Sequence, residues 1–137
     1  MRANEAGQSL QKQKSDTLKD IERMRVGGHM QEEISRFLQY ISVERRYSQK
    51  TLAAYQQDLA AFQSFIETSG GGDLKQIAYQ DVRLYLAYLN EQAYAKTSIR
   101  RKLSSLRSFF TYCLSQGWIE TNPMELVQYQ VKKKTLP

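Results

Sequence analysis

The sequence predicts an all-α protein, folded as a compact four-helix bundle with a short turn at its C-terminal end. Four segments carry apolar residues at steps of three and four, the spacing of one face of an amphipathic helix. Only a few residues connect these segments, and none alternates apolar and polar residues as a half-buried strand would. Each predicted helix has one apolar stripe, so the four are expected to be stable only around a shared core.

Composition allows one domain and favours an anionic partner. The chain has 137 residues, 41% of them hydrophobic, and a net charge of +6. This length suffices for one packed core, and the charge favours nucleic acid as a partner. The single cysteine, Cys113, lies on an apolar stripe, which excludes a disulfide framework and favours a cytoplasmic protein. No apolar run approaches the length of a membrane span, so no membrane partner is expected.

Residues 1–29 differ from the rest of the chain. They are largely polar and contain no Phe, Tyr or Trp. His29 followed by Met30 is what a common cloning site leaves ahead of a natural start methionine. We expect 1–29 to be an engineered or disordered leader outside the fold, and a natural N-terminal extension is the alternative.

The first two helices follow from Met30 onward. The first is expected at about 31–45. The second starts after Ser48, a favoured N-cap residue, and ends before the glycines at 70–72. Their buried stripes are expected to consist of Ile34, Phe37, Leu38, Ile41, Leu52, Tyr55, Leu59, Phe62 and Ile66.

The third and fourth helices are expected at about 80–92 and 96–116. Gly117 is well placed as the left-handed residue that ends the fourth helix. Asn122 and Pro123, in the N-cap and N1 order, predict the short C-terminal turn. The buried residues of these helices are expected to be Val82, Tyr85, Leu86, Leu89, Ile99, Leu103, Leu106, Phe110 and Cys113.

The outer face of the fourth helix combines small hydroxyls with arginines. A helical wheel directs Thr97, Ser98, Arg101, Ser104, Ser105 and Ser108 outward, with Arg100 and Arg107 at the edges of the buried stripe. No acidic residue lies between Glu91 and Glu120. Short hydroxyl side chains allow close approach to phosphate and base edges, and arginines supply charge and bidentate donors. We therefore expect this face to lie against DNA; the alternative is an ordinary solvated basic face.

The second helix offers a weaker signal at its N-terminus. Ser48, Gln49, Lys50 and Thr51 are placed to donate to phosphate together with free backbone N–H groups. The same residues also serve as an ordinary helix cap. Lys132–Lys134 are interpreted as part of a solvated linker, with phosphate tracking as the alternative.

The residues predict no catalytic, metal or cofactor site in this chain. One cysteine and one histidine, His29, are too few for a ligand cluster. The glycines at 70–72 lack the Lys-Ser or Lys-Thr that follows a phosphate-binding loop. Tyr55, Tyr85 and Tyr112 fall within helical patterns, so packing is the preferred interpretation for each.

Four blocks of sequence occur in the order and spacing of a known domain. They read FLQYISVERRYSQKTLAAYQQDLAAFQSFI, DVRLYLAYL, TSIRRKLSSLRSFFTYCLSQGWIETNP and KKKTLP. Together they resemble the N-terminal, SAM-like core-binding domain of tyrosine recombinases and phage integrases, above all the Xer type. On this basis the core-binding domain is expected at 30–126, and 127–137 is expected to be a truncated linker to an absent catalytic domain.

The resemblance implies double-stranded DNA as a partner, together with neighbouring recombinase protomers. In the family, the second and fourth helices cross adjacent major-groove surfaces, and the catalytic residues belong to a second domain. This fragment is therefore expected to bind DNA without cutting it. The residues that the resemblance favours for DNA contact are Lys50, Thr51, Thr97, Ser98, Arg100, Arg101, Ser104 and Arg107. For Arg100 and Arg107, bracing the bundle is the alternative.

Two other classes of function stay open from the sequence. One is a helical protein-interaction module with an incidentally basic face. The other is a stand-alone helix-turn-helix regulator, which needs a tight turn before its reading helix. The residues 92–95 are consistent with such a turn.

Overall fold

The structure is a computed structural model that describes residues 28–128 and is all-helical over that range. Four α-helices, α2 (Gly28–Val43), α3 (Gln49–Thr68), α4 (Tyr79–Glu91) and α5 (Lys96–Ser115), confirm the predicted four-helix bundle. A short 3-10 helix, η1 (Leu74–Gln76), precedes α4. The predicted leader up to residue 27 and most of the predicted linker, with Lys132–Lys134, lie outside the described residues.

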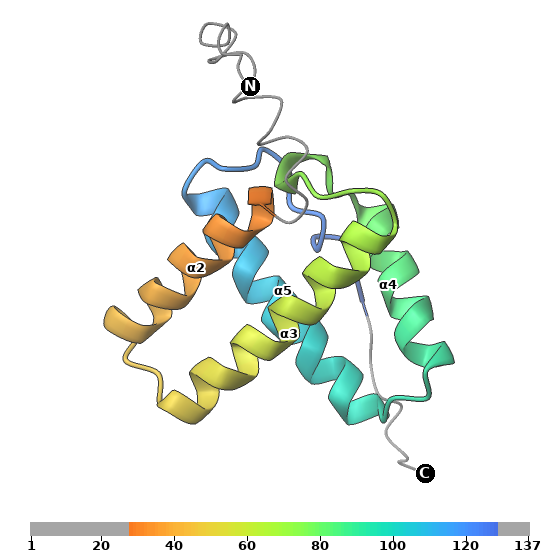
Figure 1. Cartoon of the computed structure of the whole chain (residues 1–137), viewed down its shortest axis with the longest axis horizontal. Coiled ribbons are helices and arrows are strands. Elements are labelled where there is room, and N and C mark those ends of the chain that lie inside the picture. The colour runs from red at the N-terminus through yellow and green to blue at the C-terminus, as the bar shows by residue number, and fades with distance from the viewer. Residues whose placement is uncertain (1–27, 129–137) are drawn as a thin grey trace, which may run out of the picture.

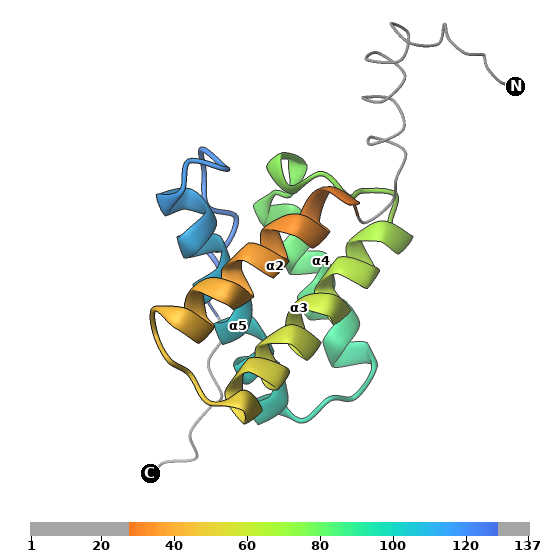
Figure 2. The same ribbon diagram turned by 60° about the vertical axis from the view of Figure 1, so that its left-hand side comes forward.

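The central helix of the bundle is α5, which packs against α2, α3 and α4 (Figure 1). Figure 2 shows α2 and α3 side by side in front of it, so α5 has one long flank covered by two helices. Aromatic rings join these elements: Phe37 on α2 meets Phe109 on α5 edge-on, with ring centroids 5.6 Å apart. Such edge-to-face pairs stabilise a core beyond the area that they bury.

Helix boundaries follow the predicted signals at most ends. The Ser48 side chain accepts a hydrogen bond from the Thr51 N–H at 3.2 Å, which confirms its role as the N-cap of α3. Gly117 ends α5 with φ +77°, a conformation that glycine adopts without steric cost. At the start of α4, the Asp81 carboxylate accepts a hydrogen bond from the Ala78 N–H at 2.8 Å.

The first helix differs from the prediction at both ends. It begins at Gly28 rather than about Gln31, and it ends at Val43 rather than Arg45. The sequence placed Met30 at the edge of the fold. In the structure it is almost fully buried and adds apolar area to the core. The folded helix therefore begins within the range that the sequence assigned to the leader.

The predicted C-terminal turn is present, and two of its apolar neighbours are buried. The Asn122 side chain accepts a hydrogen bond from the Met124 N–H at 2.8 Å, and this fixes the start of the turn. Met124 and Val127 are both buried. Val127 lies at the start of the range assigned to the linker, yet its burial makes it part of the core.

Candidate nucleic-acid interface

The outer face of α5 carries most of the predicted contact residues. Thr97, Arg100, Arg101, Ser104 and Arg107 are exposed, and Ser98 is half-buried. On α3, Lys50 is exposed and Thr51 is half-buried. The structure thus leaves these eight side chains at the surface, where a partner can reach them.

The wheel prediction is wrong for Ser105, which is buried. Its hydroxyl donates to Oδ2 of Asp58 at 2.7 Å, and Asp58 itself lies on α3 with a fully buried carboxylate. Ser105 sits at the border between the two faces of α5, and the packing of α3 turns that border inward.

Asp58 is also the anchor for the arginine at the middle of this surface. Arg101 donates through Nη2 to Oδ1 at 2.6 Å and through Nε to Oδ2 at 3.2 Å, a bidentate arrangement. The Nζ of Lys102 lies 3.6 Å from Oδ1, and its ammonium also covers the Tyr94 ring at 5.0 Å. Because hydrogen bonds fix the guanidinium, Arg101 loses little further freedom when it binds a partner.

The expectation of a surface without carboxylates therefore needs correction. The sequence of α5 contains no acid, but α3 supplies one directly beneath it. The Asp58 side chain is 0% exposed, whereas that of Arg101 is 52% exposed. The carboxylate offsets part of the positive charge from below and leaves the outer edge of the guanidinium open to solvent.

A groove joins α3 and α5 at this point and brings together four of the predicted residues. We call it the Asp58 groove; its volume is about 330 Å³. It is lined by Lys50, Thr51, Ala54, Tyr55, Asp58, Arg101, Ser104 and Ser105. Residues separated by about fifty positions in the chain thus form one polar surface at the crossing of two helices.

The other four predicted residues do not line this groove. Thr97, Ser98 and Arg100 lie nearer the start of α5. Arg107 donates through Nη2 to the Val127 carbonyl at 3.0 Å, so it braces the C-terminal turn against α5. Bracing was the alternative considered for Arg100 and Arg107, and the structure confirms it for Arg107.

A second hollow lies beyond Ser104 along α5, and sequence reasoning missed it. We call it the tyrosine pocket; it has a volume of about 450 Å³. Its lining comprises Phe37, Tyr40, Ile41, Arg45, Tyr47, Tyr55, Ser104, Arg107, Ser108, Thr111, Tyr112 and Ser115. A signal was present in the sequence, because Ser104, Ser108, Thr111 and Ser115 recur at steps of four, three and four.

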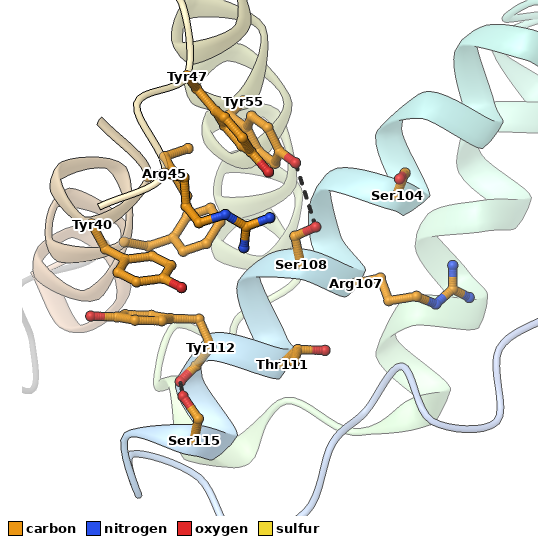
Figure 3. Close-up of a pocket in the computed structure, with 12 residues that line it drawn as sticks. Tyr40, Arg45, Tyr47, Tyr55, Ser104, Arg107, Ser108, Thr111, Tyr112 and Ser115 are labelled. Carbon is orange, nitrogen blue, oxygen red and sulfur yellow. Dashed lines mark hydrogen bonds between the residues drawn. The ribbon is translucent and has the colours of Figure 1, made fainter. Parts of the chain in front are cut away.

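Two stacked tyrosine pairs form the walls of the tyrosine pocket. Tyr40 stacks on Tyr112 with centroids 4.4 Å apart, and Tyr47 stacks on Tyr55 at 5.8 Å. Figure 3 shows the Arg45 guanidinium between the two pairs, on the side of Ser108. It lies 5.4 Å from the Tyr47 ring centroid, and a hydrogen bond with Tyr40 is the largest of the effects that raise the pKa of Arg45.

The buried nucleophile candidates are packing residues. Burial raises the pKa of the Cys113 thiol to about 12, which disfavours the reactive thiolate. Burial likewise raises the pKa of Tyr85, whose hydroxyl has no hydrogen-bond partner within residues 28–128. Over the same residues, no cluster of three or more His, Cys, Asp and Glu side chains is arranged to hold a metal ion. None of the helices described there is long and apolar enough to cross a membrane.

Comparison with known proteins identifies the domain. Residues 34–117 match the model of the phage integrase N-terminal SAM-like domain, which covers more than half of the chain. The chain belongs to this family. The match confirms the resemblance drawn from the four sequence blocks, and it includes α3, α4, α5 and most of α2.

The relatives to which this chain is similar include recombinases of the Xer type. The chain is 44% identical over 105 residues to a tyrosine recombinase XerC of Pediococcus pentosaceus, an alignment covering 76% of this chain and 35% of that protein. A tyrosine recombinase XerC of Listeria innocua is 38% identical over 102 residues, covering 74% of this chain and 34% of the relative. The chain thus spans about a third of the length of these relatives. No solved structure gives a significant match.

Proposed function

We propose that this domain binds double-stranded DNA through α3 and α5, as the N-terminal DNA-binding domain of a Xer-type tyrosine recombinase. The single observation that carries the proposal is the Asp58 groove. There the exposed edge of Arg101, fixed from below, lies beside Lys50, Thr51 and Ser104 at the crossing of two helices. A rigid guanidinium among short hydroxyls and a flexible lysine supplies both bidentate and point-charge donors for phosphate and base edges.

The wider role follows from the relatives, which are named tyrosine recombinases. The parent protein would break and rejoin DNA in the cytoplasm, in chromosome-dimer resolution or in DNA integration, through a catalytic domain distinct from this one. This domain would hold one half-site and contact neighbouring protomers, and it would need no cofactor of its own. Thr97, Ser98 and Arg100 would extend the contact toward the start of α5.

The test is a charge substitution at Ser104, measured by fluorescence anisotropy on a duplex across a range of salt concentrations. Ser104 is exposed, and its side chain forms no hydrogen bond within residues 28–128 that a larger side chain would break. Ser104→Glu is expected to weaken duplex binding about tenfold, since it places a carboxylate against phosphate. Wild-type affinity should fall with salt, with a slope of about −0.9 for each phosphate neutralised.

Ser35→Glu is the matched control, because Ser35 is exposed on α2 and lines neither hollow. Its effect should be small. Equal losses from both substitutions, or duplex binding that ignores salt, would contradict the proposal and favour a protein-interaction module.

A second pair of variants addresses the helix-turn-helix alternative. The turn at 92–95 between α4 and α5 is as short as that alternative requires, with Ala93 at φ 63°. A regulator that reads DNA with α5 alone predicts no role for Lys50 on α3. We expect Lys50→Glu to weaken duplex binding about tenfold, whereas Lys75→Glu, an exposed lysine on η1, should not.

A further inference from the structure

The tyrosine pocket differs from the Asp58 groove in its charge. Among residues 28–128, its lining includes two arginines, Arg45 and Arg107, and no acidic residue. Arg107 lies at its edge and is directed to the Val127 carbonyl, away from the tyrosines (Figure 3). Arg45, whose side chain is exposed, is therefore the cation that faces the pocket, and within residues 28–128 it forms no ion pair.

The position of Arg45 is set by its surroundings rather than by a carboxylate. The loop that carries it is tied back to α2, because the Tyr47 N–H donates to the Ile41 carbonyl at 3.1 Å. At Arg46, the chain turns back through a left-handed conformation, with φ 54°. The Tyr47 ring covers one face of the guanidinium, with its centroid 5.4 Å from Cζ. A guanidinium has five N–H donors, so most of its donors stay available to an anion.

Hydroxyl groups complete the polar side of the pocket. Ser108 and the Tyr55 hydroxyl lie 3.5 Å apart at its centre, a distance at the limit of a hydrogen bond. Ser104 and Thr111 are exposed on either side. An arginine with free donors, flanked by hydroxyls and without a carboxylate, is the chemistry that recognises a phosphate oxygen.

We propose that the tyrosine pocket binds a phosphodiester group of the same DNA duplex that occupies the Asp58 groove, with Arg45 as its main cationic contact. This inference rests on the proposed function. The two hollows share Tyr55 and Ser104, so one ligand can cover both. From Arg101 to Thr111, α5 advances about 15 Å, slightly more than the major-groove width of about 12 Å. A duplex that places one backbone strand at Arg101 therefore brings the strand on the other side of its major groove toward the pocket.

The experiment measures duplex affinity against salt concentration for the full chain and for Arg45→Gln. Removing one phosphate contact should reduce the magnitude of the log–log slope by about 0.9 and weaken binding about five- to tenfold at low salt. The matched control is Arg83→Gln, because Arg83 is an exposed arginine that covers a tyrosine ring, Tyr79, at 5.9 Å. Arg83→Gln removes the same charge and should leave the slope close to that of the wild type.

A second variant tests the pocket without altering its loop. Thr111→Glu adds a carboxylate on the exposed side of α5, and we expect it to reproduce the loss seen with Arg45→Gln. Slopes for Arg45→Gln and Thr111→Glu equal to that of Arg83→Gln would overturn the pocket contact while leaving the proposed function intact. Wild-type protein without salt-dependent duplex binding would instead overturn the proposed function.

A free nucleotide is the other source of a phosphate group. Titration of thymidine 5′-monophosphate, followed by changes in tyrosine fluorescence, separates the two sources. The duplex inference predicts no saturable binding at millimolar concentration, because a single phosphate lacks the contacts in the Asp58 groove. Saturable nucleotide binding that Arg45→Gln abolishes, together with an unchanged duplex slope, would overturn the assignment to duplex DNA.

Discussion

The Asp58 groove and the tyrosine pocket adjoin each other along α5, yet they hold their arginines by different means. Arg101 is fixed by a bidentate contact with a buried carboxylate. Arg45 is exposed and lies against the Tyr47 ring, and within residues 28–128 it forms no ion pair. The Asp58 carboxylate holds Arg101 firmly, but it offsets part of the positive charge of the guanidinium. It also couples the position of Arg101 to the packing of the core. The aromatic contacts leave the full positive charge available and engage the core less. Arg101 thus has the firmer position, whereas Arg45 keeps more of its positive charge available.

The largest effect should come from Asp58→Ala. The substitution leaves the buried Ser105 hydroxyl and the nearly buried Lys102 ammonium without their acceptor. We expect a loss of about 3 kcal/mol in the free energy of unfolding, measured by urea denaturation. Ser105→Ala, which removes only one donor, should cost about 1 kcal/mol. A loss for Asp58→Ala no larger than that for Ser105→Ala would show that the carboxylate does not anchor this region.

A smaller effect is expected in the wall of the tyrosine pocket. Tyr112 stacks on Tyr40 and meets Trp118 edge-on, with centroids 5.5 Å apart. A double-mutant cycle with Tyr40→Leu and Tyr112→Leu, followed by urea denaturation, should give a coupling of about 1 kcal/mol. Coupling near zero would mean that the stacked pair contributes no stability of its own. The difference in stability contribution between the tyrosine pocket and the Asp58 groove would then be greater.

The smallest effect should come from Tyr55, one of the two residues that the hollows share. Tyr55→Phe removes a hydroxyl whose contact with Ser108 is long, at 3.5 Å. We expect a change in the free energy of unfolding below about 0.5 kcal/mol, because a contact of this length is a weak hydrogen bond. A loss above about 1 kcal/mol would show that Tyr55 joins the two hollows structurally, and they would then count as one unit.

Local sequence signals predicted the fold well. The 3.6-residue period of Ile99, Leu103 and Leu106 placed the buried stripe of α5 where the structure has it. Ser48 and Gly117 marked helix ends through backbone requirements that act within a few residues. These predictions succeeded because each depends on neighbours along the chain.

The candidate site was predicted only in part. Lys50, Arg101 and Ser104 were named from the sequence, and the structure brings them to one groove. The partner beneath them, Asp58, was not named, because it reads as one polar position on another helix. For Arg45, nothing in its own segment indicates the tyrosines that surround it.

By itself, the sequence determined the helices, their apolar stripes and the family to which the chain belongs. Only the tertiary structure decided the direction of Ser105, the burial of Val127 and the pairing of Asp58 with Arg101. The physical reason is the range of the interactions. Helix periodicity and capping act over a few residues, whereas the contact between Asp58 and Arg101 joins residues 43 positions apart through the packing of α3 on α5.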